Sequence, residues 1–394
     1  MRYLGLEFRI QVIGICLSFG TWCLEFLCFP LSTYSFKHHS MTRNQKPASL
    51  TQHPDPNPRP FVIPVFLPHA GCAHQCVFCN QVSITGRRQS AVDADRIRSQ
   101  IRQFLEYKHG RRKPVQISFY GGNFLGLKID EIVLLLDLAA EFIDRGQVDA
   151  IRFSTRPDTI TPENLDIIAR YPVETIELGV QSMNDQVLAL AERGHSAADT
   201  VRAVEQLKEH QFDIGLQLMV GLPGDTEARS LLSAEKIAAL QPDFVRIYPT
   251  LVIKNSKLAR WYHNGSYTPL SLAEAVSLTK KCYLLFKKHA IGVIRMGLQA
   301  TEDPADGSTV LAGPYHPAFG HLVYSAIFMD QAQKALDSMR TLSDTITIAV
   351  NPRSISKMRG LNNDNIEKLK NRCQLQYVAV VPDSSLAPDE LKVG

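Results

Sequence analysis

The chain has 394 residues, an apolar fraction of 45% and a formal net charge of +4. This length allows one domain-sized core and a second, smaller module, and the composition excludes a largely disordered chain. Eight cysteines, unevenly placed, are too few for a disulfide framework. The small positive charge permits a polyanionic partner without requiring one.

Residues 12–31 form an apolar run, VIGICLSFGTWCLEFLCFPL, in which Glu25 is the single charge. The run is long enough to cross a bilayer. Three interpretations stay open. Either the translation start is placed too early, with Met41 as the true one, or the run forms a membrane anchor, or it is a signal peptide, although no A-x-A-like site follows. Basic residues behind an anchor would keep the body in the cytosol. We therefore expect a cytoplasmic protein that meets a membrane only if this extension is real.

Beyond Pro60, short β-type runs alternate with helical patterns. Six strands are predicted, at 61–67, 115–122, 150–158, 173–182, 212–224 and 243–250. This alternation predicts parallel strands joined by right-handed crossovers. No G-x-G-x-x-G follows the first strand, so a partial (β/α)6 barrel is favoured over a dinucleotide-binding sheet.

The last part of the chain contains a helical pattern ending at Met339 and two strand patterns, TITIAV and QLQYVAV. These predict a small C-terminal α/β domain. The expected organisation is an apolar N-terminal extension at 1–40, a linker at 41–60, the barrel at 61–300 and the C-terminal domain at 301–394.

Unusual motifs follow each predicted strand, and barrels of this type carry their chemistry at the strand ends. Any one glycine at such a place often only makes a turn. Six motifs on one rim favour a functional site. They are the cysteines of 72–79, Gly121–Phe124, Ser154–Arg156, Gln181–Ser182, Gly221–Gly224 and Tyr248–Pro249.

Three cysteines follow the first strand with the spacing Cys72-x3-Cys76-x2-Cys79. A closed zinc site would take His69 or His74 as fourth ligand. An iron–sulfur cluster on three thiolates would leave one iron without a protein ligand, which is useful only if a cofactor or substrate binds there. The surrounding barrel favours the cluster, and disulfide pairing is least expected in a reducing compartment.

This cysteine spacing, with Phe78 before the third cysteine, resembles the signature of the radical SAM superfamily. The resemblance implies a [4Fe-4S] cluster on Cys72, Cys76 and Cys79, whose open iron chelates S-adenosylmethionine. An electron from a low-potential donor of the flavodoxin or ferredoxin type would then release a deoxyadenosyl radical. The radical chemistry belongs to the cofactor, while the protein holds the cluster and positions the substrate.

Five further blocks resemble the radical SAM half of the Elongator catalytic subunit and bacterial relatives that lack its acetyltransferase domain. The similarity covers about residues 61–260 and implies tRNA as a candidate partner. The blocks are FYGGNFLGL (119–127), STRPD (154–158), ELGVQSM (177–183), RGH (193–195) and IYPTLVIK (247–254).

The same resemblance implies a cofactor site at the ends of the second to fifth strands. The glycine pair would meet the methionine amino group, the polar residues would face its carboxylate or the ribose, and the fifth-strand segment would pack on adenine. The expected cofactor-binding residues are Gly121, Gly122, Asn123, Arg156, Gln181, Arg193, Met219 and Gly221.

Two departures limit the resemblance. Elongator has a longer cysteine loop, and its acetyltransferase domain is not expected within 301–394.

Three hypotheses therefore stay open. The first is a radical SAM enzyme acting on RNA, for which the basic segments 87–88 and 108–113 could contact phosphates. The second is a radical SAM enzyme on a small molecule or porphyrin, and the third is a zinc-bound scaffold without catalysis.

Overall fold

The computed structural model describes residues 60–67, 71–80, 92–107, 114–298, 309–339 and 344–394. The N-terminal extension, nearly all of the linker, His69, both basic segments and the domain boundary expected at residue 300 lie outside these ranges. Within them, no helix is both long enough and apolar enough to span a bilayer.

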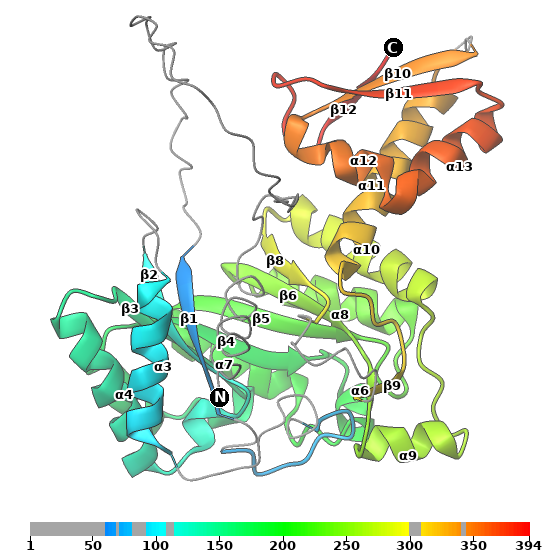
Figure 1. Ribbon diagram of the computed structural model, residues 1–394. Coiled ribbons are helices and arrows are strands. Elements are labelled where there is room, and N and C mark those ends of the chain that lie inside the picture. The colour runs from blue at the N-terminus through cyan, green and yellow to red at the C-terminus, as the bar shows by residue number, and fades with distance from the viewer. Residues whose placement is uncertain (1–59, 68–70, 81–91, 108–113, 299–308, 340–343) are drawn as a thin grey trace, which may run out of the picture.

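A curled, parallel, seven-stranded sheet forms the main domain (Figure 1). Its strands follow the order β1-β2-β3-β4-β5-β6-β8, and each neighbouring pair is parallel. The partial barrel and all six predicted strands are confirmed. A short seventh strand, GVIRM, was not predicted and lies at the edge of the sheet next to β6. The bounds are β1 Phe61–Phe66, β2 Val115–Tyr120, β3 Ala150–Thr155, β4 Val173–Gln181, β5 Asp213–Val220, β6 Phe244–Pro249 and β8 Gly292–Met296.

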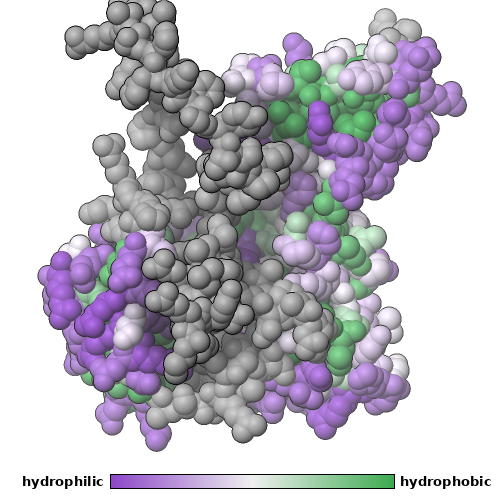
Figure 2. All heavy atoms as spheres, in the orientation of Figure 1, coloured by the Kyte–Doolittle hydropathy of each residue, from purple (hydrophilic) through white to green (hydrophobic). Residues whose placement is uncertain are grey.

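Helices cover the outside of the sheet. Local sequence sets the start of α5, for example: Thr161 accepts a hydrogen bond from the Asn164 N–H, and Pro162 stands at the first helical position. The surface over α3 and α4 is mostly hydrophilic (Figure 2). The bounds are α3 Ala94–Glu106, α4 Ile129–Asp144, α5 Pro162–Ile168, α6 Asp185–Leu190, α7 Ala197–Glu209, α8 Glu227–Ala239, α9 Lys257–His263 and α10 Leu272–Lys288, with 3₁₀ turns η1 Phe124–Gly126 and η2 Pro157–Thr159.

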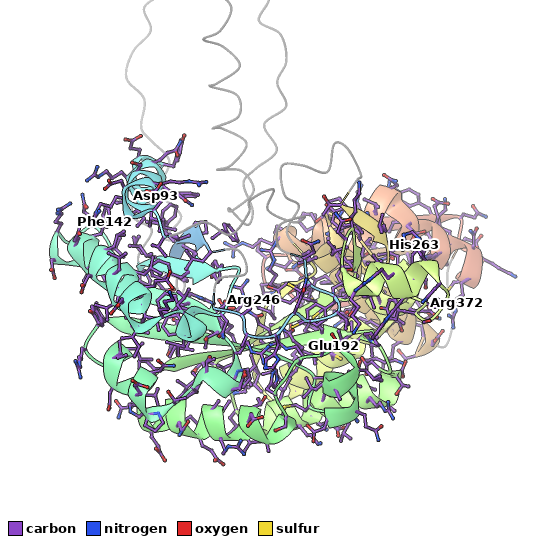
Figure 3. All side chains as sticks on the ribbon, turned by 90° about the horizontal axis from the view of Figure 1, so that it is seen from below. Asp93, Phe142, Glu192, Arg246, His263 and Arg372 are labelled. Carbon is purple, nitrogen blue, oxygen red and sulfur yellow. The ribbon has the colours of Figure 1, made fainter. Side chains whose placement is uncertain are left out.

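The two faces of the sheet differ in chemistry. Side chains alternate between faces along a strand, and the outward set is fully buried and apolar, as at Ile117, Phe153 and Leu216. The inward set includes polar side chains, such as those of Tyr120, Arg152 and Arg246. Tyr120 on β2 contacts Arg246 on β6, with 3.4 Å between the hydroxyl and Nη2, although three strands lie between them. In a flat sheet these strands would be about 19 Å apart, so the contact requires the curl, inside which Arg246 lies (Figure 3).

The small C-terminal α/β domain is also confirmed. Its three-stranded sheet has the order β11-β10-β12. Helix α11 serves both cores: Phe319 and Val323 pack with the barrel, whereas Ala332 and Leu336 pack with the small sheet. The remaining bounds are β7 Val252–Ile253, β9 Val310–Ala312, α11 Phe319–Asp337, β10 Thr345–Val350, η3 Pro352–Ser354, α12 Ile355–Arg359, η4 Leu361–Asn363, α13 Asp364–Cys373, β11 Tyr377–Pro382 and β12 Leu391–Val393.

Candidate active site

The cysteine loop crosses the carboxyl ends of the strands and is anchored by Val77. This side chain is fully buried in a small apolar cluster that also contains Val187, Leu222 and Leu258. Its backbone N–H donates to the Ala191 carbonyl at 3.1 Å, and its carbonyl accepts from the Leu258 N–H at 2.8 Å. Since Val77 lies between the second and third cysteines, these contacts fix both of them at the rim of the barrel.

The three cysteines differ in exposure. Cys76 is buried, Cys79 is half-buried and Cys72 is exposed at the rim. Protein atoms packed around the Cys72 sulfur, and then the charge of Cys76, raise the pKa of this thiol, whereas Arg193 and Arg156 oppose the shift. In the part of the chain that the structure describes, no three His, Cys, Asp or Glu side chains are arranged to hold a metal ion.

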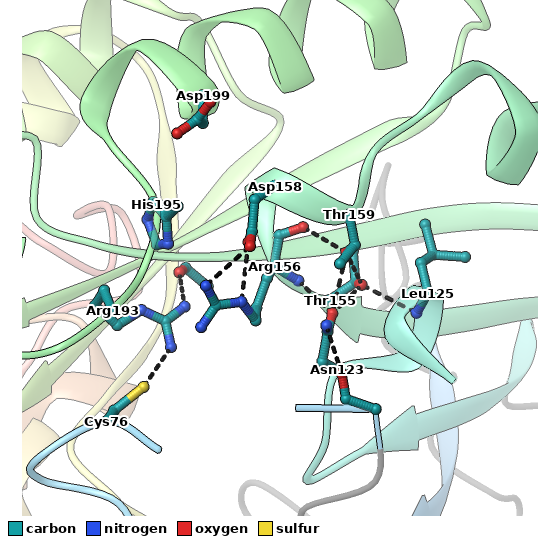
Figure 4. A network of polar contacts seen from close by, with 12 residues as sticks. Cys76, Asn123, Leu125, Thr155, Arg156, Asp158, Thr159, Arg193, His195 and Asp199 are labelled. Carbon is teal, nitrogen blue, oxygen red and sulfur yellow. Dashed lines mark hydrogen bonds and ion pairs between the residues drawn. The ribbon is translucent and has the colours of Figure 1, made fainter. Parts of the chain in front are cut away.

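Asn123 joins the cysteine loop to the third strand (Figure 4). Its Nδ2 donates to the Gly71 carbonyl at 2.9 Å. Its Oδ1 accepts from the Thr155 hydroxyl at 2.7 Å, the Thr159 hydroxyl at 3.0 Å and the Arg156 N–H at 2.9 Å. The residue is 2% exposed, so Asn123 is a buried structural hub whose side-chain contacts are to protein groups.

Gly71 allows the cysteine loop to approach the segment around Asn123 closely. Its φ is +72°, a region that side chains rarely adopt, and a Cβ there would lie 2.1 Å from the Asn123 carbonyl oxygen. The loop can therefore pack directly on the turn after β2. That turn begins with Gly121, also at positive φ, and continues through Gly122.

Arg156 and Arg193 place two buried guanidinium groups at the rim. Arg156 forms a two-pronged ion pair with Asp158, at 2.9 and 3.0 Å. Arg193 has no acidic partner among the described residues; it donates to Cys76 Sγ at 3.1 Å and to the Gly179 carbonyl at 2.5 Å. These two cations and one carboxylate leave the rim with an excess positive charge beside the cysteine loop.

Gln181 ends β4 in a strained conformation. Its φ is +67°, and the pairing of β4 with β5 shifts register just before it. A Cβ on Gly179 would lie 3.1 Å from Gln181 Nε2 and 3.2 Å from Arg193 Nη2. The missing side chain of Gly179 thus leaves the space in which these two polar side chains meet.

His195 lies behind the arginines. Burial, and then the charges of Arg193 and Arg156, lower the pKa of this imidazole to about 4. The ring is therefore neutral near pH 7, and its Nε2–H donates to the Val180 carbonyl at 3.2 Å.

Met219 and Gly221 lie on the other side of the rim. Met219 packs against the apolar cluster that anchors Val77. Gly221 instead accepts a 2.6 Å hydrogen bond from the Tyr267 hydroxyl and donates its N–H to Asp225. The structure thus brings Cys76, Arg156, Gln181 and Arg193 close to one another, supports them through Asn123, and leaves Gly221 in separate contacts.

Several polar atoms at the rim are buried without a hydrogen-bond partner in the described structure. Buried polar groups in proteins are nearly always paired, so such a cluster indicates a place for a polar ligand. The atoms are Ser154 Oγ, Arg156 Nη1, Gln181 Oε1, Arg193 Nε and His195 Nδ1.

A second polar cluster, which was not predicted from the sequence, lies deeper on the inner face. Glu177, which is fully buried, accepts hydrogen bonds from Arg152 Nε at 2.7 Å and from the Tyr120 hydroxyl at 3.2 Å. Arg246 Nε lies 2.6 Å from its other oxygen. Burial opposes ionisation, but Arg246 and Arg152 hold the pKa of Glu177 below its ordinary value. Polar residues at alternate positions of neighbouring strands were the available signal.

Comparison with known proteins places the fold in a family. The model of the radical SAM superfamily matches residues 66–233, and that of the radical SAM C-terminal domain matches residues 242–328. The chain belongs to the radical SAM superfamily. Among solved structures, an archaeal Elp3 of Methanocaldococcus infernus with an N-terminal deletion shares the fold. Its TM-score is 0.54 at 22% identity, over 68% of this chain and 62% of that one.

Two curated relatives resemble this radical SAM chain. An uncharacterized protein of Methanocaldococcus jannaschii is 28% identical over 228 residues, which cover 55% of this chain and 69% of the relative. A tRNA uridine(34) acetyltransferase of Methanocaldococcus infernus is 26% identical over 302 residues, which cover 67% of this chain. The match spans only 55% of that acetyltransferase.

Proposed function

We propose that this radical SAM protein holds a [4Fe-4S] cluster through Cys72, Cys76 and Cys79 and binds S-adenosylmethionine at the adjoining rim. When bound, these groups supply one-electron cleavage of the sulfonium and a deoxyadenosyl radical that abstracts hydrogen from a substrate. A chain that belongs to this superfamily is expected to be an enzyme. The three cysteines supply the thiolates that a cluster needs, and the polar residues at the rim fit S-adenosylmethionine.

The observation that carries the proposal is the set of unpartnered polar atoms beside the cysteine loop. Arg156 Nη1 and Gln181 Oε1 are buried without partners, and Arg193 places a second guanidinium against Cys76. A guanidinium binds a carboxylate strongly, and an amide oxygen accepts from an amine or hydroxyl. S-adenosylmethionine offers a carboxylate, an amine and two ribose hydroxyls, so its polar groups match these atoms.

The other residues act by positioning. Asn123 ties the loop to β3 through Gly71, and Val77 holds the segment between Cys76 and Cys79 in its apolar cluster. Arg193 donates to the Cys76 sulfur, and hydrogen bonds to ligand sulfurs tune the potential of an iron–sulfur cluster. Gly121 and Gly122 leave backbone groups open to close approach, and Met219 and Gly221 would line the adenine side.

We further propose that the substrate is tRNA and that a flavodoxin- or ferredoxin-type donor supplies the electron. The support is the match of two thirds of this chain to a tRNA uridine(34) acetyltransferase. A small-molecule substrate is the alternative outcome of the test. Reduced enzyme should form deoxyadenosine faster when unmodified tRNA is added, whereas an unchanged rate would contradict the tRNA assignment.

Iron and sulfide analysis after anaerobic reconstitution tests the cluster. About four iron and four sulfide ions per chain are expected. Cys76→Ala should lose them, because two thiolates are too few to retain the cluster. Cys282→Ala is the matched control, since this buried cysteine lies on α10 in the barrel core, away from the loop. Stoichiometric zinc without sulfide would support the scaffold hypothesis instead.

A further inference from the structure

The inner face of the sheet carries cations well below the rim. Glu177 precedes Gln181, at the end of β4, by four positions, or about 13 Å along the strand. Arg246 lies three positions before the end of β6, and Arg295 pairs with it in register on β8. These side chains form a polar floor below the cofactor residues of the rim.

Solvent reaches this floor. Along β6 the inward residues Phe244, Arg246 and Tyr248 are half-buried, whereas the outward residues between them are fully buried. Gln217 and Met219 on β5 show the same partial exposure. The inner face is therefore accessible to a ligand, while the outer face is closed by helices.

The charges on the floor do not balance. Glu177 is shared between Arg152 and Arg246. Arg152 also lies near Asp213, where burial raises the pKa of the carboxyl and the charge of Arg152 opposes that shift. Arg295 has no acidic partner within the described ranges. Its Nε donates to the Gly297 carbonyl at 3.3 Å. With Asp213 counted beside Arg152, three guanidinium groups face two carboxylates, an excess of one positive charge.

The environment of the Arg295 guanidinium is unfavourable for a cation. Burial lowers its pKa below the ordinary value, and the like charge of Arg246 acts in the same direction. An anion that arrived beside it would relieve both effects. Tyr248 adds a hydroxyl here, 3.5 Å from Arg246 Nη1.

We propose that Arg295, with Arg246 and Tyr248, binds the carboxylate of a small organic co-substrate on the inner face of the sheet. The excess charge of one matches a monoanion, and the planar guanidinium fork matches a planar carboxylate. The site lies about three strand residues, or roughly 10 Å, below the rim, so a small group rather than a polynucleotide backbone is the natural occupant. The inference goes beyond the proposed function and rests on it only in calling the ligand a co-substrate.

Chemical modification of arginine tests this site without any radical chemistry. The full chain, before and after cluster reconstitution, is treated with phenylglyoxal, and labelled arginines are mapped by peptide mass spectrometry. Acetate is the probe and acetamide its uncharged analogue of the same size, with chloride keeping ionic strength equal. At an acetate concentration about twice the dissociation constant, labelling of Arg295 should slow about three-fold, because two thirds of the sites are filled.

The controls make each outcome decisive. Exposed Arg353, in the C-terminal domain, should react at the same rate in acetate and acetamide. Acetate should raise the melting temperature of the wild type. Arg295→Met should lose this rise, and Arg353→Met should keep it. Equal labelling of Arg295 in both solutions would overturn the proposal. Protection by inorganic phosphate but not by acetate would overturn the carboxylate assignment. Because labelling needs no cluster, its failure is distinct from a failure to cleave S-adenosylmethionine.

Discussion

The two faces of the seven-stranded sheet are built from alternate residues of the same strands, but they have different roles. On β3, Phe153 is fully buried and stacks on Phe124 with ring centroids 4.5 Å apart. Its neighbour Arg152 turns inward to Glu177. Apolar packing on the outer face supplies stability, whereas the inner face and the rim hold charges that folding alone does not require. A slip of one residue would exchange the two sets.

The largest change in stability should come from the outer face. Phe153→Ala removes a ring from the closed core and should lower the free energy of unfolding by about 3–5 kcal/mol. Chemical denaturation measures this loss. Leu232→Ala is the control, because that side chain is 46% exposed, and it should cost less than about 1 kcal/mol. Equal losses in the two variants would break the distinction between core and surface.

A large pH effect should come from the rim. The pKa of His195 is about 4 in the folded chain against an ordinary value of 6.5. As the pH falls, this imidazole is therefore protonated in the unfolded chain before it is protonated in the folded chain. Its contribution to the free energy of unfolding is complete above pH 6.5 and is lost as the pH falls toward 4, by about 3 kcal/mol. His195→Gln retains a donor for the Val180 carbonyl and does not titrate. Its stability should fall less over the same interval, and identical slopes would contradict the assignment.

A smaller loss is expected at Asn123, which connects the two regions. Asn123→Ala leaves the Arg156 N–H and the Gly71 carbonyl without their partner and should cost about 2 kcal/mol. Asn123→Asp keeps the acceptor but loses the donor to Gly71. The variant should therefore keep the contacts to β3 but loosen the cysteine loop. Reconstituted protein should then lose iron during gel filtration. Full retention of iron in both variants would mean that Val77 alone secures the loop.

The smallest change in stability is expected on the floor. Arg295→Met removes a cation that has no acidic partner in the described ranges and keeps much of the apolar stem. The free energy of unfolding should change by less than about 1 kcal/mol, or rise slightly, as measured by denaturation. A loss of several kcal/mol would show that Arg295 stabilises the barrel and is not held for a ligand.

Sequence patterns predicted most of the sheet because its strands are short β-type runs that alternate with helical patterns. Strand β8 escaped prediction because GVIRM is short and half-exposed, with no buried alternation to reveal it. The small domain was predicted from TITIAV, whereas β12 has three residues and depends on tertiary pairing with β10.

The rim residues could be chosen because they follow strand ends, but their contacts could not be foreseen. Nothing in the sequence indicates that Asn123 would be a hub for Thr155 and Thr159, since these bonds require the turn after β2 to approach β3. The pairing of Glu177 with Arg246 depends on the curl of the sheet, which brings distant strands together. Local patterns specify elements, and closure of the sheet specifies the polar sites.

Formation of deoxyadenosine from S-adenosylmethionine tests the central claim, that the rim holds the cluster and its cofactor, most directly. Reduced, reconstituted wild-type protein should release deoxyadenosine slowly without added substrate, and Cys76→Ala should release none. Arg156→Met should keep its iron, because no cysteine is changed, but bind the cofactor more weakly by roughly 2–3 kcal/mol, the worth of a charged hydrogen bond. Wild-type protein with a full complement of iron and sulfide that formed no deoxyadenosine would contradict the account.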